Sequence, residues 1–212
     1  MKLQLKPHIF EGRLITFCGL DGCGKTTLIK LLKQYFAEFD TDIFLTKQPT
    51  DDVRNSDIFR TYMDNPDHSG YDYRSLSLFA ASDRIQHTNN CIIPMLRKGI
   101  TVISDRYFYS CLANLRARGY TEDNWIYEIS SHIVKPDISI FLDVDVDLAI
   151  QRVRTRSSEK YRYIDIELQY KLKEEYINIA NDIGGVIINT NRDIESSFYE
   201  LQTHLSKVLH NV

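Results

Sequence analysis

Residues Gly19-Leu-Asp-Gly-Cys-Gly-Lys-Thr26 decide the fold of this chain of 212 residues. They follow the pattern Gly-x-x-x-x-Gly-Lys-Thr, in which the glycines let successive backbone N–H groups point inward around a phosphate. The apolar run at 14–17 predicts a buried strand before this loop, and the periodic apolar residues at 28–32 predict a helix after it. Because a helix N-terminus attracts negative charge, the loop is placed to bind the phosphates of a nucleotide.

The residue types in the loop indicate how a nucleoside triphosphate would be held. Lys25 can reach the outer phosphates, and the hydroxyl of Thr26 can ligate a magnesium ion. The predicted triphosphate-binding residues are Gly19, Gly22, Gly24, Lys25, Thr26 and Thr27.

The composition of the chain narrows its function class. Apolar residues make up 43% and charged residues 26%, which is typical of a folded domain. A formal net charge of −3 argues against a general nucleic-acid or membrane-surface role. Neither a signal peptide nor a membrane-spanning run is recognisable. The cysteines show neither Cys-x-x-Cys spacing nor a nearby histidine, so we expect reduced thiols in a cytoplasmic protein without a zinc site.

Short apolar runs alternate with longer helical patterns along the chain. The predicted strands are Leu14–Cys18, Ile43–Thr46, Ile100–Ser104, Ile138–Leu142 and Val186–Ile188. The predicted helices are Thr26–Phe39, Asp57–Asp64, Tyr73–Arg97, Tyr109–Arg118, Asn124–Val134, Val146–Thr155, Ile166–Asp182 and Ile194–Leu209. This alternation predicts an α/β fold, a five-stranded parallel sheet flanked by helices on both faces.

Polar residues follow the third predicted strand, at the edge where the phosphate loop also lies. The Asp105 carboxylate can bind magnesium directly or through water, and Arg106 offers a planar fork suited to a phosphate. A surface ion pair at a strand end is the alternative interpretation of these residues.

An ordered set of motifs from about residue 12 to 205 resembles the thymidylate kinase family. The loop Cys18–Thr27 resembles the family's phosphate loop, and Leu45–Thr50 is similar to its Thr-Arg-Glu-Pro element. Leu78–His87 resembles its thymine-reading helix. Ser104–Ser110 is similar to its Asp-Arg-Tyr-x-x-Ser box, and Lys135–Asp145 resembles its Pro-Asp-x-x-x-x-Leu-Asp-Val-Asp strand.

The resemblance implies one P-loop nucleoside monophosphate kinase domain over residues 1–212, with a mobile lid at about 154–165. The implied reaction is ATP-dependent phosphorylation of dTMP to dTDP, with Mg²⁺ as cofactor. ATP and a nucleoside monophosphate would be the partners, without nucleic acid or membrane. The family is commonly dimeric, so we expect a homodimer.

Phosphoryl transfer between two polyanions needs converging cations. By resemblance, the predicted catalytic residues are Lys25, Arg106, Arg156, Lys160 and Arg162. The last three lie in a basic stretch that resembles the lid, although a solvated basic helix end would look similar. Arg152 either stacks on the ATP adenine or has a structural role.

The resemblance also implies the acceptor site. Asp21 would contact the sugar 3′-hydroxyl, unless it only accepts backbone N–H bonds or faces water. Arg84 would read the thymine carbonyl, unless it is a surface residue paired with Asp83 or Asp105. We also expect a cis bond between Gln48 and Pro49. The predicted acceptor residues are Asp21, Pro49, Phe79, Arg84, Asp105, Arg106, Ser110 and Asn114, and the predicted metal ligands are Thr26 and Asp105.

Some positions depart from the family pattern. The aromatic ring that stacks on the base lies four residues before the reading arginine, where this chain has Ala80. Phe79 lies five residues before Arg84 and is therefore rotated by about 100°, unless a helix bulge restores it. Asn114 replaces an aromatic residue that disfavours ribose, and Lys47 and Gln48 replace Arg and Glu. These departures leave open another pyrimidine monophosphate as acceptor.

Two rival functions share the phosphate loop. A deoxynucleoside kinase would phosphorylate a sugar hydroxyl and would need a general base, for which Asp21 is an imperfect candidate. The second rival is a nucleotide-dependent switch or regulatory binding protein. A guanine-binding switch would need Asn-Lys-x-Asp after a late strand, and residues 189–193 do not supply that spacing.

Overall fold

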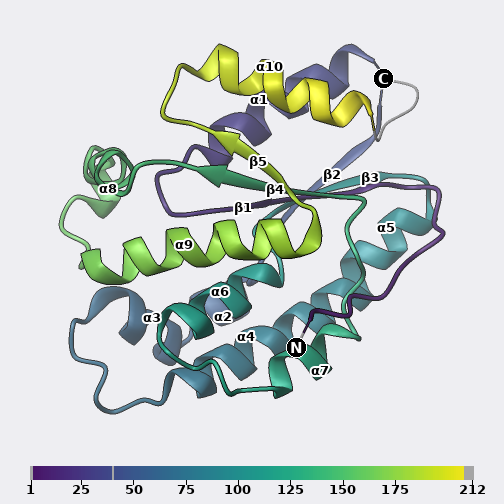
Figure 1. Ribbon diagram of the computed structural model, residues 1–212. Helices are drawn as coiled ribbons and strands as arrows, with labels where there is room; N and C mark the ends of the chain where they lie inside the picture. The colour runs from purple at the N-terminus through teal and green to yellow at the C-terminus, as the bar shows by residue number, and fades with distance from the viewer. Residues whose placement is uncertain (1, 40, 208–212) are drawn as a thin grey trace.

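A parallel sheet forms the centre of the computed structural model, which describes residues 2–39 and 41–207 (Figure 1). Its 5 strands lie in the order β2-β3-β1-β4-β5. The strands are β1 (Leu14–Cys18), β2 (Ile43–Lys47), β3 (Thr101–Asp105), β4 (Ile138–Asp143) and β5 (Val186–Asn189). Every residue of β1 is buried, as expected for a strand covered on both faces. The predicted five-stranded parallel sheet is therefore confirmed.

Helices cover both faces of this sheet. In Figure 1, α1 and α10 lie on one side of it, while α5, α6 and α9 lie on the other with α4 beyond them. The helices are α1 (Lys25–Glu38), α2 (Asp51–Arg54), α3 (Asp57–Asp64), α4 (Tyr73–His87), α5 (Ile93–Arg97), α6 (Tyr109–Ala117), α7 (Trp125–Ser130), α8 (Val146–Arg154), α9 (Ile166–Ile183) and α10 (Ile194–Ser206). Among the described residues, no helix is both long and apolar enough to cross a membrane.

The structure differs from the predicted helices in a few places. A π-helical turn at Thr88–Ile92 interrupts the long helix predicted over Tyr73–Arg97, and a 3₁₀ turn at Ser157–Glu159 lies inside the predicted lid. The four-residue helix α2 was not predicted, because it is too short to show a helical period. Helix α7 ends at Ser130 instead of Val134. The predicted end of the last helix, residues 208–209, falls outside the described residues.

The strand register gathers the chemically active segments at one edge of the sheet. Phe17 at the end of β1 pairs with Asp105 of β3, and Lys47 at the end of β2 pairs with the same residue. Asp105 therefore lies between the phosphate loop that follows β1 and the segment that follows β2.

Candidate active site

The phosphate loop joins β1 to α1 in a conformation that only glycine adopts easily. Gly22 has φ of 85° and Gly24 has φ of 98°. A Cβ atom on Gly22 would lie 2.2 Å from the carbonyl oxygen of Ala149, whereas a Cβ on Gly24 would meet nothing within 4 Å. Gly22 thus lets the loop pack against α8, and Gly24 leaves open the space in front of the α1 N-terminus.

Lys25 lies across the inside of this loop. Only 6% of its surface is exposed, and its Nζ donates to the carbonyl oxygens of Gly19 at 3.1 Å and Leu20 at 2.7 Å. These bonds hold the ammonium group where the backbone N–H groups of the loop also point. A cation held here can meet a bound phosphate without first being ordered.

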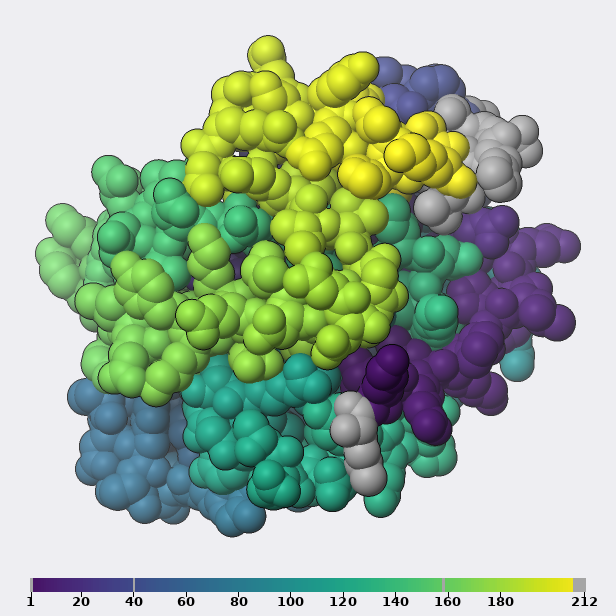
Figure 2. Space-filling model, viewed as in Figure 1, coloured from purple at the N-terminus to yellow at the C-terminus, as the bar shows by residue number. Residues whose placement is uncertain are grey.

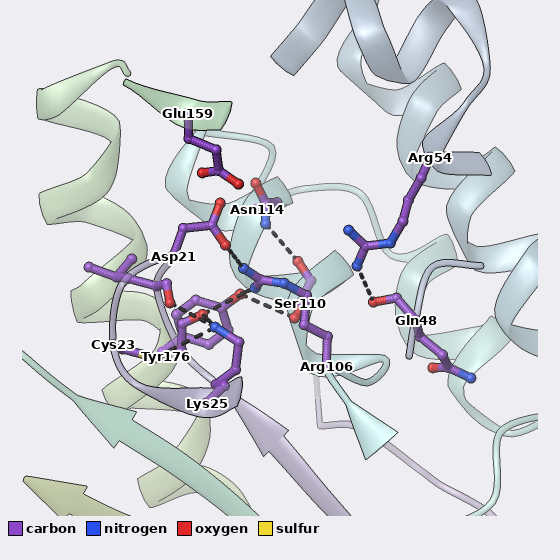
Figure 3. A network of polar contacts seen from close by, with 12 residues as sticks. Asp21, Cys23, Lys25, Gln48, Arg54, Arg106, Ser110, Asn114, Glu159 and Tyr176 are labelled. Atoms are coloured by element: carbon purple, nitrogen blue, oxygen red, sulfur yellow. Dashed lines mark hydrogen bonds and ion pairs between the residues drawn. The ribbon is translucent and has the colours of Figure 1, made fainter. Parts of the chain in front are cut away.

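Asp21 joins the phosphate loop to two arginines from distant parts of the chain. Its Oδ1 accepts from Arg106 (Figure 3). Its Oδ2 accepts from Arg162 at 2.8 Å. Burial opposes the charged form of this carboxyl, but Arg106, Lys25 and Arg162 together hold its pKa well below the ordinary value. Asp21 is therefore an ionised bridge between these cations.

Arg106 is held in place by its backbone and its side chain. Its φ is 69°, a value that costs free energy in a residue with a Cβ atom. Its Nη1 donates to the carbonyl oxygen of Gly19 and to the hydroxyl of Tyr176, each at 3.1 Å. The Tyr176 hydroxyl donates onward to Oγ of Ser110 at 3.1 Å, so the guanidinium has a fixed direction (Figure 3).

Asp105 and Thr26 offer oxygen atoms to a cation. Oδ1 of Asp105 is buried and has no hydrogen-bond partner among the described residues, and Thr26 is exposed at the start of α1. Both residues line the same cavity. Within the described residues, no group of three or more His, Cys, Asp or Glu could hold a metal by itself. A carboxylate, a hydroxyl, water and phosphate oxygens form the oxygen-rich set that Mg²⁺ prefers.

A cavity of about 630 Å³ extends from the phosphate loop to α4. Its walls come from α2, α3, α4, α6, α9 and the segment around the 3₁₀ turn at Ser157–Glu159. In Figure 2 the lime-green start of α9, which follows this turn, lies directly against the blue segment that contains α3. A second cavity of about 740 Å³, between α8 and α9, is lined by none of the predicted site residues.

At the far end of the main cavity lies Arg84 of α4. It is 2% exposed, and its guanidinium donates to the carbonyl oxygens of Ala80 at 2.8 Å and Tyr107 at 3.4 Å. The alternative interpretation was a surface Arg84 paired with Asp83 or Asp105. Among the described residues, Arg84 forms neither of these ion pairs. Buried donors at one end of the cavity and phosphate-binding groups at the other suit a ligand with a polar ring and a phosphate.

Comparisons with known proteins identify the family of this arrangement. A family model described as thymidylate kinase matches residues 17–200. A probable thymidylate kinase of Pyrococcus horikoshii is 37% identical over 188 residues, which cover 87% of this chain and 91% of that protein. A probable thymidylate kinase of Pyrococcus abyssi is 38% identical over the same length, and a thymidylate kinase of a Geobacillus species is 31% identical over 197 residues, 89% of this chain and 93% of that protein.

The chain belongs to the thymidylate kinase family. The resemblance inferred from its motifs is thereby confirmed, and so is the expected type of fold. Most of the residues that the motifs single out lie together around the main cavity. Those that line it are Asp21, Gly22, Gly24, Lys25, Thr26, Thr27, Pro49, Arg84, Asp105, Arg106, Ser110, Asn114, Arg156 and Arg162.

The lid of this thymidylate kinase family member brings some of its cations to the cavity and not others. Arg162 is 18% exposed and pairs with Glu159 at 3.0 Å as well as with Asp21, while Arg156 lies 3.8 Å from Glu159. The exposed Lys160 does not line the cavity, and its Nζ lies 5.5 Å from the ring centre of Tyr161. The structure therefore does not place Lys160 with the predicted catalytic cations.

Two further predicted contacts do not reach the cavity. Phe79 is 42% exposed on α4 and is absent from the cavity wall, because the π-helical turn lies after Arg84 and does not rotate Phe79 inward. The structure therefore does not place Phe79 with the other predicted acceptor residues. Arg152 donates to the carbonyl oxygens of Gly22 at 3.4 Å and Thr190 at 3.0 Å. These bonds fit the structural role that sequence left open for it.

Sequence reasoning missed Arg54, a further cation in the cavity wall. Arg54 ends α2, and its Nε donates to the carbonyl oxygen of Pro49 at 2.8 Å. The peptide bond between Gln48 and Pro49 is cis, as expected. Burial, followed by the charge of Arg106, lowers the pKa of Arg54. The acidic first turn before it, Asp51-Asp52, was the only signal of a helix start that could have drawn attention to this residue.

Proposed function

We propose that this chain transfers the terminal phosphoryl group of ATP to the 5′-phosphate of dTMP and releases ADP and dTDP. The observation that carries the proposal is the convergence of Lys25, Arg106 and Arg162 on one cavity. They come from the phosphate loop, the end of β3 and the lid. Membership of the thymidylate kinase family supports the same reaction. Because both substrates are polyanions, bringing them together requires this kind of charge neutralisation.

The acceptor phosphate would be held by Arg106 and Arg54. Both guanidinium groups line the cavity, and each is anchored by backbone carbonyl oxygens. Arg84, at the other end, would donate to a carbonyl oxygen of the base, which a buried and preordered guanidinium suits. Bound phosphates would replace Asp21 as partners of Arg106 and Arg162. The Asp21 carboxylate would then accept a hydrogen bond from the sugar 3′-hydroxyl.

The donor would lie over the phosphate loop, with Lys25 at its outer phosphates. When bound, Mg²⁺ would neutralise charge on the phosphates of ATP. The Thr26 hydroxyl and the free Oδ1 of Asp105 are the oxygens that fit this ion. Arg156 and Arg162 would close over the phosphates and exclude water, which otherwise competes as an acceptor.

Acceptor choice is the finer part of this proposal. Ala80 and Asn114 line the cavity where the family pattern has aromatic rings. We measure this choice by ADP release with ATP, Mg²⁺ and a panel of dTMP, dUMP, UMP, CMP, AMP and GMP, with thymidine as the control. The proposal predicts the highest kcat/KM for dTMP. Preference for thymidine over dTMP would indicate a deoxynucleoside kinase, and preference for another monophosphate would reassign the acceptor.

The homodimer and the cytoplasmic location expected from sequence stay predictions. Light scattering coupled to size-exclusion chromatography tests the dimer directly, because the mass of the chain is 24.8 kDa.

A further inference from the structure

Helix α4 holds the last two residues of β2 and the three after them, together called the Thr46–Thr50 loop, through two side chains one helical turn apart. Asp83 accepts from the backbone N–H of Thr50 at 2.9 Å through Oδ2, and from the Thr50 hydroxyl at 2.5 Å through Oδ1. Asp83 directly precedes Arg84, which lies at the base end of the cavity. Helix α4 therefore carries the arginine expected to bind the base and also holds the Thr46–Thr50 loop.

His87 makes the second connection from α4 to the same loop. Its Nε2 lies 2.8 Å from the hydroxyl of Thr46, and its Nδ1 lies 3.1 Å from the amide nitrogen of Gln48. An amide nitrogen only donates, so Nδ1 accepts and the ring proton of neutral His87 lies on Nε2, facing Thr46. Burial, aided by the charge of Arg84 and opposed by Asp83, lowers the pKa of His87 and favours this neutral form.

The Thr46–Thr50 loop in turn orients Arg54. The backbone carbonyl of Gln48 accepts from Nη2 of Arg54 at 3.4 Å, and that of Pro49 accepts from its Nε at 2.8 Å. Figure 3 shows the Gln48 carbonyl facing Arg54 while its side-chain amide points away from Arg54. The nitrogen of that amide is the one that lies 3.1 Å from Nδ1 of His87. Gln48 is fully buried, so the loop cannot shift without breaking these contacts.

Arg54 itself has no carboxylate within ion-pair distance among the described residues. Among the described residues, the Arg54 guanidinium donates only to the carbonyl oxygens of Gln48 and Pro49, so its direction depends on the Thr46–Thr50 loop. A partly buried cation that forms no ion pair among the described residues, in the wall of a cavity that Arg106 also lines, is suited to an anionic ligand.

We propose that Asp83 and His87 are positioning residues that hold the Thr46–Thr50 loop so that Arg54 points at the acceptor phosphate. Neither residue lines the cavity. They link the base end of the acceptor pocket, through α4, to its phosphate end, through the loop. The inference rests on the proposed function, because it takes Arg54 to be a ligand of that phosphate.

The test compares the affinities for dTMP and thymidine, measured by calorimetry, in Asp83→Asn and His87→Phe. Thymidine lacks the phosphate but keeps the base and sugar. The proposal predicts that dTMP affinity falls by about tenfold, the usual cost of a displaced hydrogen bond to a charged group, while thymidine affinity is unchanged. The matched controls are His132→Phe and Ser82→Ala, both at exposed positions, which should alter neither affinity.

A double-mutant cycle with Arg54→Ala then shows whether the effect passes through Arg54. If it does, adding Asp83→Asn or His87→Phe to Arg54→Ala costs little further dTMP affinity, because the residue they orient is already gone. If His87→Phe fails to fold, Thr50→Val is the alternative variant, because it removes the hydrogen bond from the Thr50 hydroxyl to Asp83. It should likewise lower the ratio of dTMP affinity to thymidine affinity.

Equal loss of dTMP and thymidine affinity would overturn the inference, and so would losses that add fully to that of Arg54→Ala. Failure of the proposed function looks different. In that case Arg54→Ala alone would leave the ratio of the two affinities unchanged, or wild-type protein would not discriminate dTMP from thymidine.

Discussion

Asp21 of the phosphate loop and Arg162 of the predicted lid lie 2.8 Å apart as an ion pair. The same carboxylate also binds Arg106, so one anion connects the donor loop, the predicted acceptor cation and the lid. This arrangement holds the two arginines together at the wall of the main cavity.

Asp21→Asn should therefore loosen the lid. The neutral amide loses the charge that holds Arg162 and Arg106, although it can still form a hydrogen bond. Faster hydrogen exchange and faster tryptic cleavage are expected across residues 155–163, with unchanged exchange in β1. Identical lid exchange in the variant and the wild type would show that this ion pair does not hold the lid.

Lys25→Ala should abolish most turnover and leave the fold intact. The ammonium group is held by carbonyl oxygens inside the loop, and its removal takes away a preordered cation at the transferred group. Loss of one such electrostatic contact costs about 10²–10³-fold in kcat. Steady-state ADP release measures this, with circular dichroism as the check on folding. Wild-type rates in the folded variant would reject Lys25 as a catalytic residue.

Arg84→Ala should weaken dTMP binding more than ATP binding. Arg84 is buried at the end of the cavity remote from the phosphate loop, and a lost hydrogen bond from a charged donor costs about 1.5–3 kcal/mol. Calorimetry with each nucleotide separately measures the two affinities. If both fall to the same extent, Arg84 does not belong to the acceptor site.

Most of the fold and much of the site could be predicted from the sequence, because both rest on local patterns. The buried strands are continuous apolar runs, and the phosphate loop has fixed spacing. The position of Asp105 and Arg106 beside the phosphate loop could also be predicted, because parallel strands bring their carboxyl ends to one edge of the sheet. Residues placed by irregular backbone were harder to predict. Arg54 is the last residue of a helix of one turn, which is too short to have a periodic signal.

Two predicted site residues, Phe79 and Lys160, do not line the cavity, and the physical reason is again irregular backbone. Phe79 was a candidate only if the helix changed register before Arg84, and the register change occurs after it, at Thr88–Ile92. Lys160 lies in the right segment, but its backbone carbonyl accepts from Arg154 at 2.9 Å and its ammonium group lies near Tyr161. Charge along a short irregular segment does not reveal which side chains face inward.

Acidification should destabilise the protein through His87. Its pKa is lowered from the ordinary value of 6.5 by burial, so the unfolded chain binds a proton more readily than the folded one. The free energy of unfolding therefore falls as pH decreases below 6.5, until the lowered pKa is passed. Urea unfolding between pH 7.5 and 5 measures this slope. The slope should be smaller in His87→Phe, and an identical slope in both proteins would contradict the prediction.

The most direct test of the account is a crystal structure with a bisubstrate ligand, adenosine joined to thymidine through a chain of phosphates. The account predicts that Lys25, Arg106 and Arg162 each contact oxygens of the central phosphates, with Arg84 at the thymine. A structure in which these cations contact no common phosphate, or in which thymine lies away from Arg84, would contradict it.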